Sequence, residues 1–183
     1  MIADESELIE RYLRGLGAAR ADVVLGIGDD AALLRMPPDT ELVLTTDALV
    51  EGVHFLPGAP ARSLGHRSLA VNLSDIAAMG ASPAWALLAL NLPDADAQWL
   101  QPFAAGFGDL ARVHGVALVG GNVSRGPLSI TVQLAGVAPP GQALRRSGAA
   151  GGEGLYVSGT LGDAAAGLKY LRAQLRAAPE AGA

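Results

Sequence analysis

The chain is organised around the stretch Leu42-Val43-Leu44-Thr45-Thr46-Asp47-Ala48-Leu49-Val50-Glu51-Gly52-Val53-His54-Phe55. It opens as a short apolar run with a β-branched residue, which predicts a strand buried on both faces. That strand would present two hydroxyls and a carboxylate, from Thr45, Thr46 and Asp47, at its C-terminal end, where chains of this kind usually bind ligands. Taken alone, these residues could equally close a strand and begin a turn, so the interpretation depends on the rest of the chain.

Composition favours a folded cytoplasmic protein. Of the 183 residues, 50% are hydrophobic and 17% are charged, and a chain of this size buries about two-thirds of its unfolded surface. Cysteine is absent, which excludes disulfides and thiolate chemistry. The acidic start, Met1 to Glu7, is unlike a secretory signal. The longest apolar runs, such as Ala84 to Leu90, are far too short to cross a bilayer, so no membrane partner is expected.

The charge pattern argues against nucleic acid as a partner. The net charge is −5, Lys169 is the only lysine, and Arg145-Arg146 is only a pair. Neutralising a phosphate backbone takes many clustered cations, which this chain lacks. A mildly acidic chain can still bind phosphates where divalent metals mediate.

Periodicity and turn residues predict helices that alternate with strands. The expected helices cover Glu5 to Leu16, Ser63 to Gly80, Ala97 to Val113 and Gly162 to Arg176. The expected strands are Val23 to Leu25, a short strand ending at Leu34, the strand from Leu42, Ala84 to Leu92, Val116 to Val119, Leu128 to Val137 and Leu155 to Ser158. This order predicts an α+β domain with a mixed sheet, ferredoxin-like in its repeat pattern. A hairpin is expected on each side, the first across the turn at Pro37.

Two domains are expected, with the boundary at Pro139-Pro140-Gly141. Residues 1–137 would form the first. Residues 138–183 would be a linker with the first strand and helix of a second domain that is otherwise missing, since one strand and one helix cannot bury themselves alone. A partner could instead cover them. The small residues Ala177 to Ala183 are expected to be unstructured.

Four carboxylates stand out because they lie in apolar or glycine-rich surroundings: Asp29, Asp30, Asp47 and Asp75. Acids clustered near strand and helix ends repel one another unless they are protonated or bridged by cations. Oxygen ligands with hydroxyls nearby suit Mg²⁺, which combines a few carboxylates with waters and substrate phosphates. Zinc is a poor candidate, because the chain has no cysteine and its three histidines lack ligand spacing. Each acid alone could instead belong to a polar turn or a solvent-facing surface.

Two glycine-rich segments are candidate phosphate-binding loops. Gly120-Gly121 would let the backbone approach a ligand closely, but the Gly-x4-Gly-Lys-Ser/Thr pattern of a P-loop is absent. Gly26-x-Gly28 is a weak dinucleotide signal, because Asp29-Asp30 follows where a pyrophosphate would need donors. Without metal ions such a site would repel a phosphate group. With two or more metal ions it would bind a phosphate group.

Together these motifs resemble the thiamine-monophosphate kinase family of the AIR-synthase-like superfamily. The resemblance rests on Gly26-Ile27-Gly28-Asp29-Asp30-Ala31-Ala32, Leu44-Thr45-Thr46-Asp47, Val50-Glu51-Gly52-Val53-His54-Phe55, Ala70-Val71-Asn72-Leu73-Ser74-Asp75-Ile76-Ala77-Ala78-Met79-Gly80, Val119-Gly120-Gly121, Arg125-Gly126-Pro127, Arg145-Arg146-Ser147-Gly148-Ala149 and Tyr156-Val157-Ser158-Gly159-Thr160-Leu161-Gly162-Asp163. The match runs through almost the whole chain in one register, so it is highly specific.

The resemblance implies a fold, an activity and a set of site residues. The family transfers the γ-phosphoryl of ATP to thiamine monophosphate, giving thiamine diphosphate, and its members form homodimers through the sheets of their N-terminal domains. Several Mg²⁺ ions would be held by Asp30, Thr45, Thr46, Asp47, Asp75 and Asn122. ATP would contact Gly121, Asn122 and Arg146, of which Arg146 is the candidate catalytic charge, and His54 would contact the substrate.

Two departures from the family pattern matter. The family commonly has Gly-Gly-Asp-Thr-Thr-Arg-Gly-Pro where this chain has Gly120-Gly121-Asn122-Val123-Ser124-Arg125-Gly126-Pro127. Asn122 can offer its carbonyl oxygen to a metal or its amide to a phosphate, but it brings no charge, so weaker binding of one metal is expected. The second departure is length, because only the first strand and helix of the family's second domain are expected here.

Two other functions stay open. The chain could be a truncated, non-catalytic module for nucleotide binding or dimerisation. It could also be another ATP-using enzyme of the superfamily, such as the selenophosphate or hydrogenase-maturation types, although those rely on a cysteine or selenocysteine that is absent here.

Overall fold

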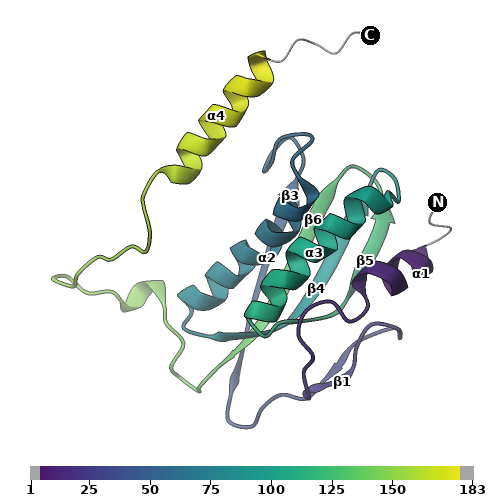
Figure 1. The fold of residues 1–183 in the computed structure, drawn as a ribbon. Coiled ribbons are helices and arrows are strands. Elements are labelled where there is room, and N and C mark those ends of the chain that lie inside the picture. Colours follow the sequence, from purple (N-terminus) through teal and green to yellow (C-terminus); the bar gives the residue numbers. More distant parts are fainter. Residues whose placement is uncertain (1–4, 178–183) are drawn as a thin grey trace. The chain divides into compact units, whose positions relative to one another are not determined.

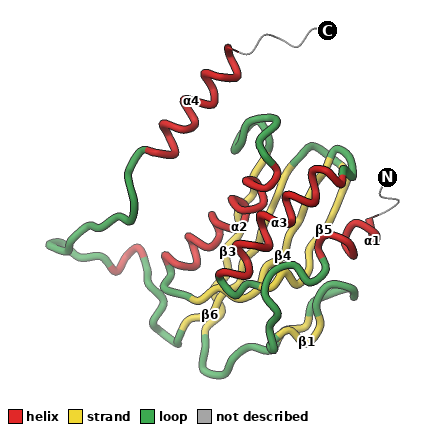
Figure 2. Tube along the Cα trace, in the orientation of Figure 1, coloured by secondary structure: helices red, strands yellow, loops and turns green. Residues whose placement is uncertain are grey.

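A four-stranded mixed sheet, with two helices on one face, dominates the computed structural model, which describes residues 5–177 (Figure 1). Its elements, in chain order, are β3 (Glu41–Val50), α2 (Ala61–Ala78), β4 (Ser82–Leu92), α3 (Ala97–Val113), β5 (Ala117–Arg125) and β6 (Ser129–Ala138). The strand order is β3-β6-β4-β5, in which β6 is antiparallel to both β3 and β4, and β4 is parallel to β5. Figure 2 shows the helices and strands as separate layers. The predicted α+β fold with a mixed sheet is confirmed, and β6 splits the β3-α2-β4 unit as in ferredoxin-like patterns.

Both predicted hairpins are wrong. The two short strands β1 (Val23–Leu25) and β2 (Leu33–Leu34) pair with each other, while β3 pairs with β6. Likewise β5 pairs with β4 rather than with β6, its neighbour in sequence. The physical reason lies in β6, whose alternate residues Ile130, Val132 and Leu134 are fully buried. A strand this apolar on one face takes the centre of the sheet, beneath the helices.

The strand β3 also differs from its prediction. It is an edge strand of ten residues, and Thr45, Thr46 and Asp47 lie in its middle rather than at its C-terminal end. Its residues alternate between a half-buried face, which carries Thr45 and Asp47, and an exposed face. It is therefore covered on one face only, because both helices lie on the same side of the sheet (Figure 1).

The N-terminal helix is shorter than predicted. It comprises α1 (Glu5–Leu8) and a π-helical turn, η1 (Ile9–Leu13), after which Arg14 is extended. Gly15 and Gly17 then have positive φ values of 70° and 95°, which favour glycine and end the helix. The chain continues along the edge of β5, where Gly17 forms a bridge with Ala117. The other helix predictions are close, and α3 has the predicted bounds.

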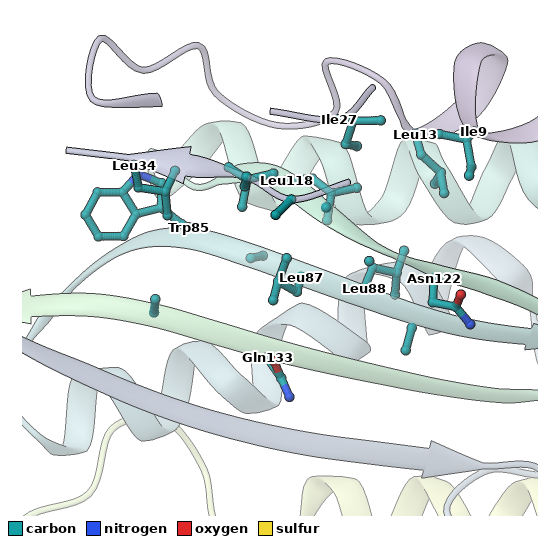
Figure 3. A pocket seen from close by; sticks show the side chains of 18 of the residues that line it. Ile9, Leu13, Ile27, Leu34, Trp85, Leu87, Leu88, Leu118, Asn122 and Gln133 are labelled. Atoms are coloured by element: carbon teal, nitrogen blue, oxygen red, sulfur yellow. The ribbon is translucent and has the colours of Figure 1, made fainter. Parts of the chain in front are cut away.

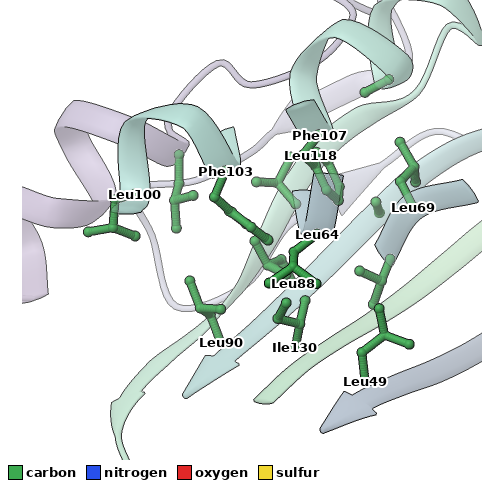
Figure 4. Packing of buried hydrophobic residues seen from close by; sticks show 14 of the residues in the cluster. Leu49, Leu64, Leu69, Leu88, Leu90, Leu100, Phe103, Phe107, Leu118 and Ile130 are labelled. Atoms are coloured by element: carbon green, nitrogen blue, oxygen red, sulfur yellow. The ribbon is translucent and has the colours of Figure 1, made fainter. Parts of the chain in front are cut away.

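The main core lies between the sheet and the two helices. Figure 4 shows Leu88 and Ile130 of the sheet packed beneath Leu64 of α2 and Phe103 of α3. The helices approach closely at two glycines, since a Cβ at Gly65 would overlap the carbonyl oxygen of Phe103 and a Cβ at Gly106 that of Arg62. We call the sheet face that these helices cover the helix-side face, and the opposite face the open face.

The chain divides into two units, which meet between Arg146 and Ser147. The second contains most of a 3₁₀ turn, η2 (Arg146–Gly148), and the helix α4 (Asp163–Ala177). The strand expected over Leu155 to Ser158 is wrong, because that segment is exposed and has no strand partner among residues 5–177. Residues 178–183, most of the tail predicted to be unstructured, lie outside the described residues. The domain boundary after residue 137 stays a prediction. No helix within residues 5–177 is long and apolar enough to cross a membrane.

Candidate functional site

Two of the predicted metal ligands meet on the helix-side face. The hydroxyl of Thr45 on β3 donates a hydrogen bond of 2.7 Å to Oδ2 of Asp75 on α2. Asp75 can reach β3 because it lies near the C-terminal end of α2, which packs along that strand. Asp47 lies two residues further along the same face of β3, as strand alternation requires. The structure thus brings a hydroxyl and a carboxylate together across thirty positions of sequence.

Thr46 points to the open face. It lies between Thr45 and Asp47, so its side chain emerges on the opposite side of β3. Its hydroxyl donates a hydrogen bond of 3.2 Å to the carbonyl oxygen of Val132 on the neighbouring strand. The three residues that sequence reasoning treated as one ligand group are therefore divided between the two faces.

A cavity of about 1090 Å³ lies over the open face and holds the remaining predicted ligands. Asp29 and Asp30 line it from the loop between β1 and β2, and Gly121 and Asn122 line it from β5. Figure 3 shows Asn122 and Gln133 beside apolar side chains such as Leu87. The Nδ2 of Asn122 donates a hydrogen bond of 2.8 Å to the hydroxyl of Ser124. The carbonyl oxygen Oδ1 is then the Asn122 atom available to a ligand.

These two groups of residues lie at opposite edges of the sheet. Thr45 is on β3 and Asn122 on β5, and the strands β6 and β4 separate them. Three strand spacings correspond to about 14 Å between the two backbones. Within the described residues, no group of three or more His, Asp or Glu side chains lies close enough to hold one metal ion. A single ion therefore cannot join Asp75 to Asn122 in this chain.

The donor chemistry nonetheless fits Mg²⁺. Thr45, Asp47 and Asp75 offer one hydroxyl and two carboxylates, and Asp30 and Asn122 offer a carboxylate and an amide oxygen. Mg²⁺ prefers oxygen ligands and commonly uses only one or two carboxylates, with waters and substrate phosphates completing its shell. Each group can thus contribute part of a coordination shell, and phosphates would have to supply the rest.

Gly121 has a structural role that sequence reasoning missed. Gly120-Gly121 is not a loop but part of β5, which continues to Arg125. Gly121 has a φ of 150°, and a Cβ there would overlap the carbonyl oxygen of Leu88 on β4. The close approach that requires glycine is therefore made by the neighbouring strand. Its predicted contact with ATP stays a proposal.

His54 and Arg146 are the other predicted site residues. His54 is exposed in the turn that follows β3, and its Nδ1 accepts a hydrogen bond of 3.1 Å from the backbone N–H of Val50. That bond assigns the ring proton to Nε2, which is free to donate outward. Arg146 is exposed at the end of the first unit.

A partly buried ion pair at the edge of the sheet was also missed by sequence reasoning. The guanidinium of Arg20 binds the Asp22 carboxylate with hydrogen bonds of 2.9 and 2.6 Å, and the indole N–H of Trp85 donates to the same carboxylate at 3.1 Å. The Arg20 hydrogen bond holds the pKa of Asp22 below its ordinary value of 3.8; burial opposes this shift, and the Trp85 hydrogen bond adds to it. In sequence, Arg20 and Asp22 look like ordinary surface charges.

The lowered pKa of Asp22 predicts acid-sensitive stability. Because the folded-state pKa lies below the unfolded one, the pairing stabilises the fold above about pH 3.8 and is lost as the pH falls through the folded-state pKa. We expect Asp22→Asn to lower the free energy of unfolding by about 1 to 2 kcal/mol at pH 7, and by progressively less below pH 4. Urea unfolding between pH 2.5 and 7 measures this, and a deficit independent of pH would contradict it.

Comparison with known proteins points to one family. The sequence model of the family AIR synthase related protein, N-terminal domain, matches residues 28–138. The thiamine-monophosphate kinase of Escherichia coli strain K12 is 50% identical over 178 residues, which make up 97% of this chain and 55% of that protein. This chain thus spans about half the length of the curated relatives it matches.

Solved structures agree with the sequence comparison. The crystal structure of thiamine-monophosphate kinase from Stenotrophomonas maltophilia K279a matches with a TM-score of 0.81 and 48% identity, over 92% of this chain and 52% of that one. A structure of AaThiL complexed with AMPPCP and TMP matches with a TM-score of 0.71 and 39% identity, over 81% of this chain and 48% of that one. The resemblance predicted from the motifs is confirmed.

Proposed function

The chain belongs to the AIR synthase related family, whose N-terminal domain it carries over residues 28–138, and from this premise we propose that it acts in thiamine-monophosphate kinase chemistry. The reaction would transfer the γ-phosphoryl of ATP to the phosphate of thiamine monophosphate and release ADP and thiamine diphosphate. The observation that carries the proposal is the Thr45–Asp75 hydrogen bond. It joins two of the expected metal ligands, one on the strand β3 and the other on the helix α2. A cytoplasmic location, where ATP is available, is part of the proposal.

The residues suit this reaction because it needs no strong general base. The acceptor is already a phosphate anion, so catalysis consists of holding two anions in line and neutralising the charge that develops between them. Bound Mg²⁺ would supply most of that neutralisation, held by Asp30, Thr45, Thr46, Asp47, Asp75 and Asn122. Arg146 would supply a further positive charge, and Gly121 would lie beside ATP. His54, with its ring oriented by Val50, would offer Nε2–H to the substrate.

The proposal includes a homodimer that packs through the open face. Leu42 and Leu44 of the edge strand β3 are 49% and 68% exposed on this face, and Leu87 of the inner strand β4 is 39% exposed, so large apolar side chains are left uncovered here. A second copy would cover them. Sedimentation equilibrium should then give twice the chain mass of 18.5 kDa, and a monomer at all concentrations up to the millimolar range would contradict the dimer.

Two measurements on the 183-residue chain test the function. Calorimetric titration with Mg²⁺ and AMPPCP measures nucleotide binding, and incubation with Mg-ATP and thiamine monophosphate measures turnover. Formation of ADP and thiamine diphosphate supports the kinase, whereas binding without turnover supports a nucleotide-binding module without activity of its own. Absence of both binding and turnover would contradict the proposal.

The variant Asn122→Asp is expected to bind Mg²⁺ about tenfold more tightly, because a carboxylate replaces an uncharged amide in the coordination shell. Titration of nucleotide binding against Mg²⁺ concentration measures the change. Asn91→Asp is the matched control, since Asn91 lies on the open face of β4 and also bonds a serine, the hydroxyl of Ser129 at 2.7 Å. An equal gain in Mg²⁺ affinity in both variants, or no gain in Asn122→Asp, would show that Asn122 is not a metal ligand.

A further inference from the structure

The segment before β1 is tied to the edge of the sheet by its backbone. The N–H of Ala18 donates to the carbonyl oxygen of Val116 at 2.7 Å, and the N–H of Leu118 donates to that of Leu16 at 3.0 Å. These bonds extend the sheet by one short stretch beyond β5. They bring Arg20 and Asp22 to the corner where the chain turns onto the open face.

At this corner, Arg20, Asp22 and Trp85 form a network that we call the clamp. The Asp22 carboxylate receives two hydrogen bonds from Arg20 and one from Trp85. Arg20 also donates to the carbonyl oxygen of Gly115 at 2.8 Å, and its guanidinium lies 5.3 Å from the centroid of the Trp85 ring. Trp85 is 2% exposed, and the Arg20 and Asp22 side chains are 22% and 21% exposed. The clamp is thus a charge-assisted network largely withdrawn from solvent.

The clamp joins directly to the hairpin of β1 and β2. The carbonyl oxygen of Asp22, just before β1, accepts from the N–H of Arg35, just after β2, at 2.8 Å. This bond joins the two ends of the hairpin at Asp22. Val23 and Leu34 then pack against the small cluster on the open face that contains Trp85, and Figure 3 shows Leu34 beside Trp85. The loop that carries Asp29 and Asp30 projects from this hairpin over the cavity.

The loop itself has few polar contacts, although Ile27 packs against the main core and the Arg14 guanidinium lies beside Gly28. Gly28, Asp29 and Asp30 are exposed, and Asp29 bonds only the backbone N–H of Asp30, at 2.8 Å. Among the described residues, the side-chain hydrogen bonds that join positions 19–36 to the sheet and its α3–β5 turn come from Arg20 and Trp85. At the end of the loop that joins the hairpin, its position above the cavity therefore depends on Arg20, Asp22 and Trp85.

We propose that Arg20, Asp22 and Trp85 are positioning residues, which hold the 26–32 loop over the cavity so that Asp30 can serve as a Mg²⁺ ligand. This inference rests on the proposed function for the role of Asp30. Trp85 is among the residues that line the cavity, whereas Arg20 and Asp22 are not. Their effect passes through the hairpin, so breaking the clamp should release the loop without unfolding the layer formed by α2 and α3.

The first test needs no ligand. Hydrogen exchange of backbone amides in residues 23–36 should become at least about tenfold faster in Asp22→Asn and in Trp85→Phe, which keeps an aromatic ring but loses the indole N–H. Amides of α2 and α3 that exchange by local opening should not change, whereas those that exchange by global unfolding should only follow the lower stability of the variant. Asp109→Asn is the matched control, because it removes an exposed ion pair with Arg62 (2.5 Å) on the other side of the sheet. Unchanged exchange in residues 23–36 of both clamp variants would overturn the proposal.

The second test is a double-mutant cycle read by calorimetric Mg²⁺ titration of the full chain. Asp22→Asn should weaken Mg²⁺ binding about tenfold alone and have no further effect in an Asp30→Asn background, because both changes act through one ligand. Equal losses in the two backgrounds would overturn the proposal. If wild type binds no Mg²⁺, or Asp30→Asn abolishes binding, hydrogen exchange alone decides the clamp. The first of these results would count against the proposed function instead.

Discussion

Replacing Gly106 by valine is expected to unfold the first unit at moderate denaturant. A Cβ at this position would overlap the backbone carbonyl of Arg62 on α2, and backbone cannot rotate aside as a side chain can. The helices would have to separate, which exposes Phe103 and Phe107, both fully buried. Overpacking a core usually costs about 1 to 3 kcal/mol, and exposing part of two phenylalanines adds to this. We expect a loss of at least about 3 kcal/mol, a large share of the 5 to 15 kcal/mol typical of a domain.

Urea unfolding, followed by circular dichroism, measures this loss. Two glycine variants serve as controls, because neither places a Cβ against backbone of another element. In Gly108→Ala the new methyl meets the tips of Leu16 and Arg112, and in Gly167→Ala, on α4, it meets nothing within 4 Å. Both should be neutral or slightly stabilising, since alanine favours helix over glycine by up to about 1 kcal/mol. If Gly106→Val were as stable as these controls, the close helix crossing would be wrong.

Elements marked by local signals were predictable from the sequence. The bounds of α3 follow from Asp96, whose Oδ1 accepts the N–H of Gln98 at 2.8 Å, and from Gly115 with its φ of 66°. Strand pairing was not predictable in this way. Whether β3 joins β2 or β6 depends on which strand can be buried under both helices, and that is a property of the assembled layers.

The candidate site shows the same limit. A resemblance of motifs implied that Asp30, Thr45, Asp75 and Asn122 share a function, but it could not show that β6 and β4 separate Thr45 from Asn122. The sequence also predicts that Gly121 approaches a ligand, because its real neighbour, the Leu88 carbonyl, lies far away in sequence. Only the pairing of β4 with β5 reveals that contact.

The clamp could not be predicted from the sequence for a different reason. Trp85 lies in an apolar run that predicts a buried strand, and strand alternation alone places its ring on the open face. Its polar N–H required a partner there, since buried tryptophan usually finds one. The sequence could therefore predict that Trp85 has a hydrogen-bond partner, but not that the partner is Asp22, 63 positions earlier.

The second large effect is expected at Asp75. Asp75→Asn keeps the shape of the side chain and an oxygen that can accept from Thr45, but removes the charge that, in the proposed function, would attract Mg²⁺. Changes outside the coordination shell already weaken metal binding by about 10- to 100-fold, so loss of a charged ligand should reduce Mg²⁺-dependent nucleotide binding by about 100-fold or more. The free energy of unfolding should change by less than about 0.5 kcal/mol, because Asp75 is exposed.

Three variants together separate the metal role of Asp75 from a structural one. Thr45→Val removes the hydroxyl but keeps a β-branched shape suited to β3, and it should weaken Mg²⁺ binding about tenfold. Asp94→Asn removes an exposed carboxylate that lies 3.6 Å from Arg125, and it should leave Mg²⁺ binding unchanged. If Asp75 is a metal ligand, Asp75→Asn should bind Mg²⁺ most weakly of the three variants. Its midpoint of urea unfolding should equal that of the wild type. If Asp75→Asn and Asp94→Asn bound Mg²⁺ equally well, the Thr45–Asp75 hydrogen bond would only join β3 to α2, and the metal site would have to lie over the open face.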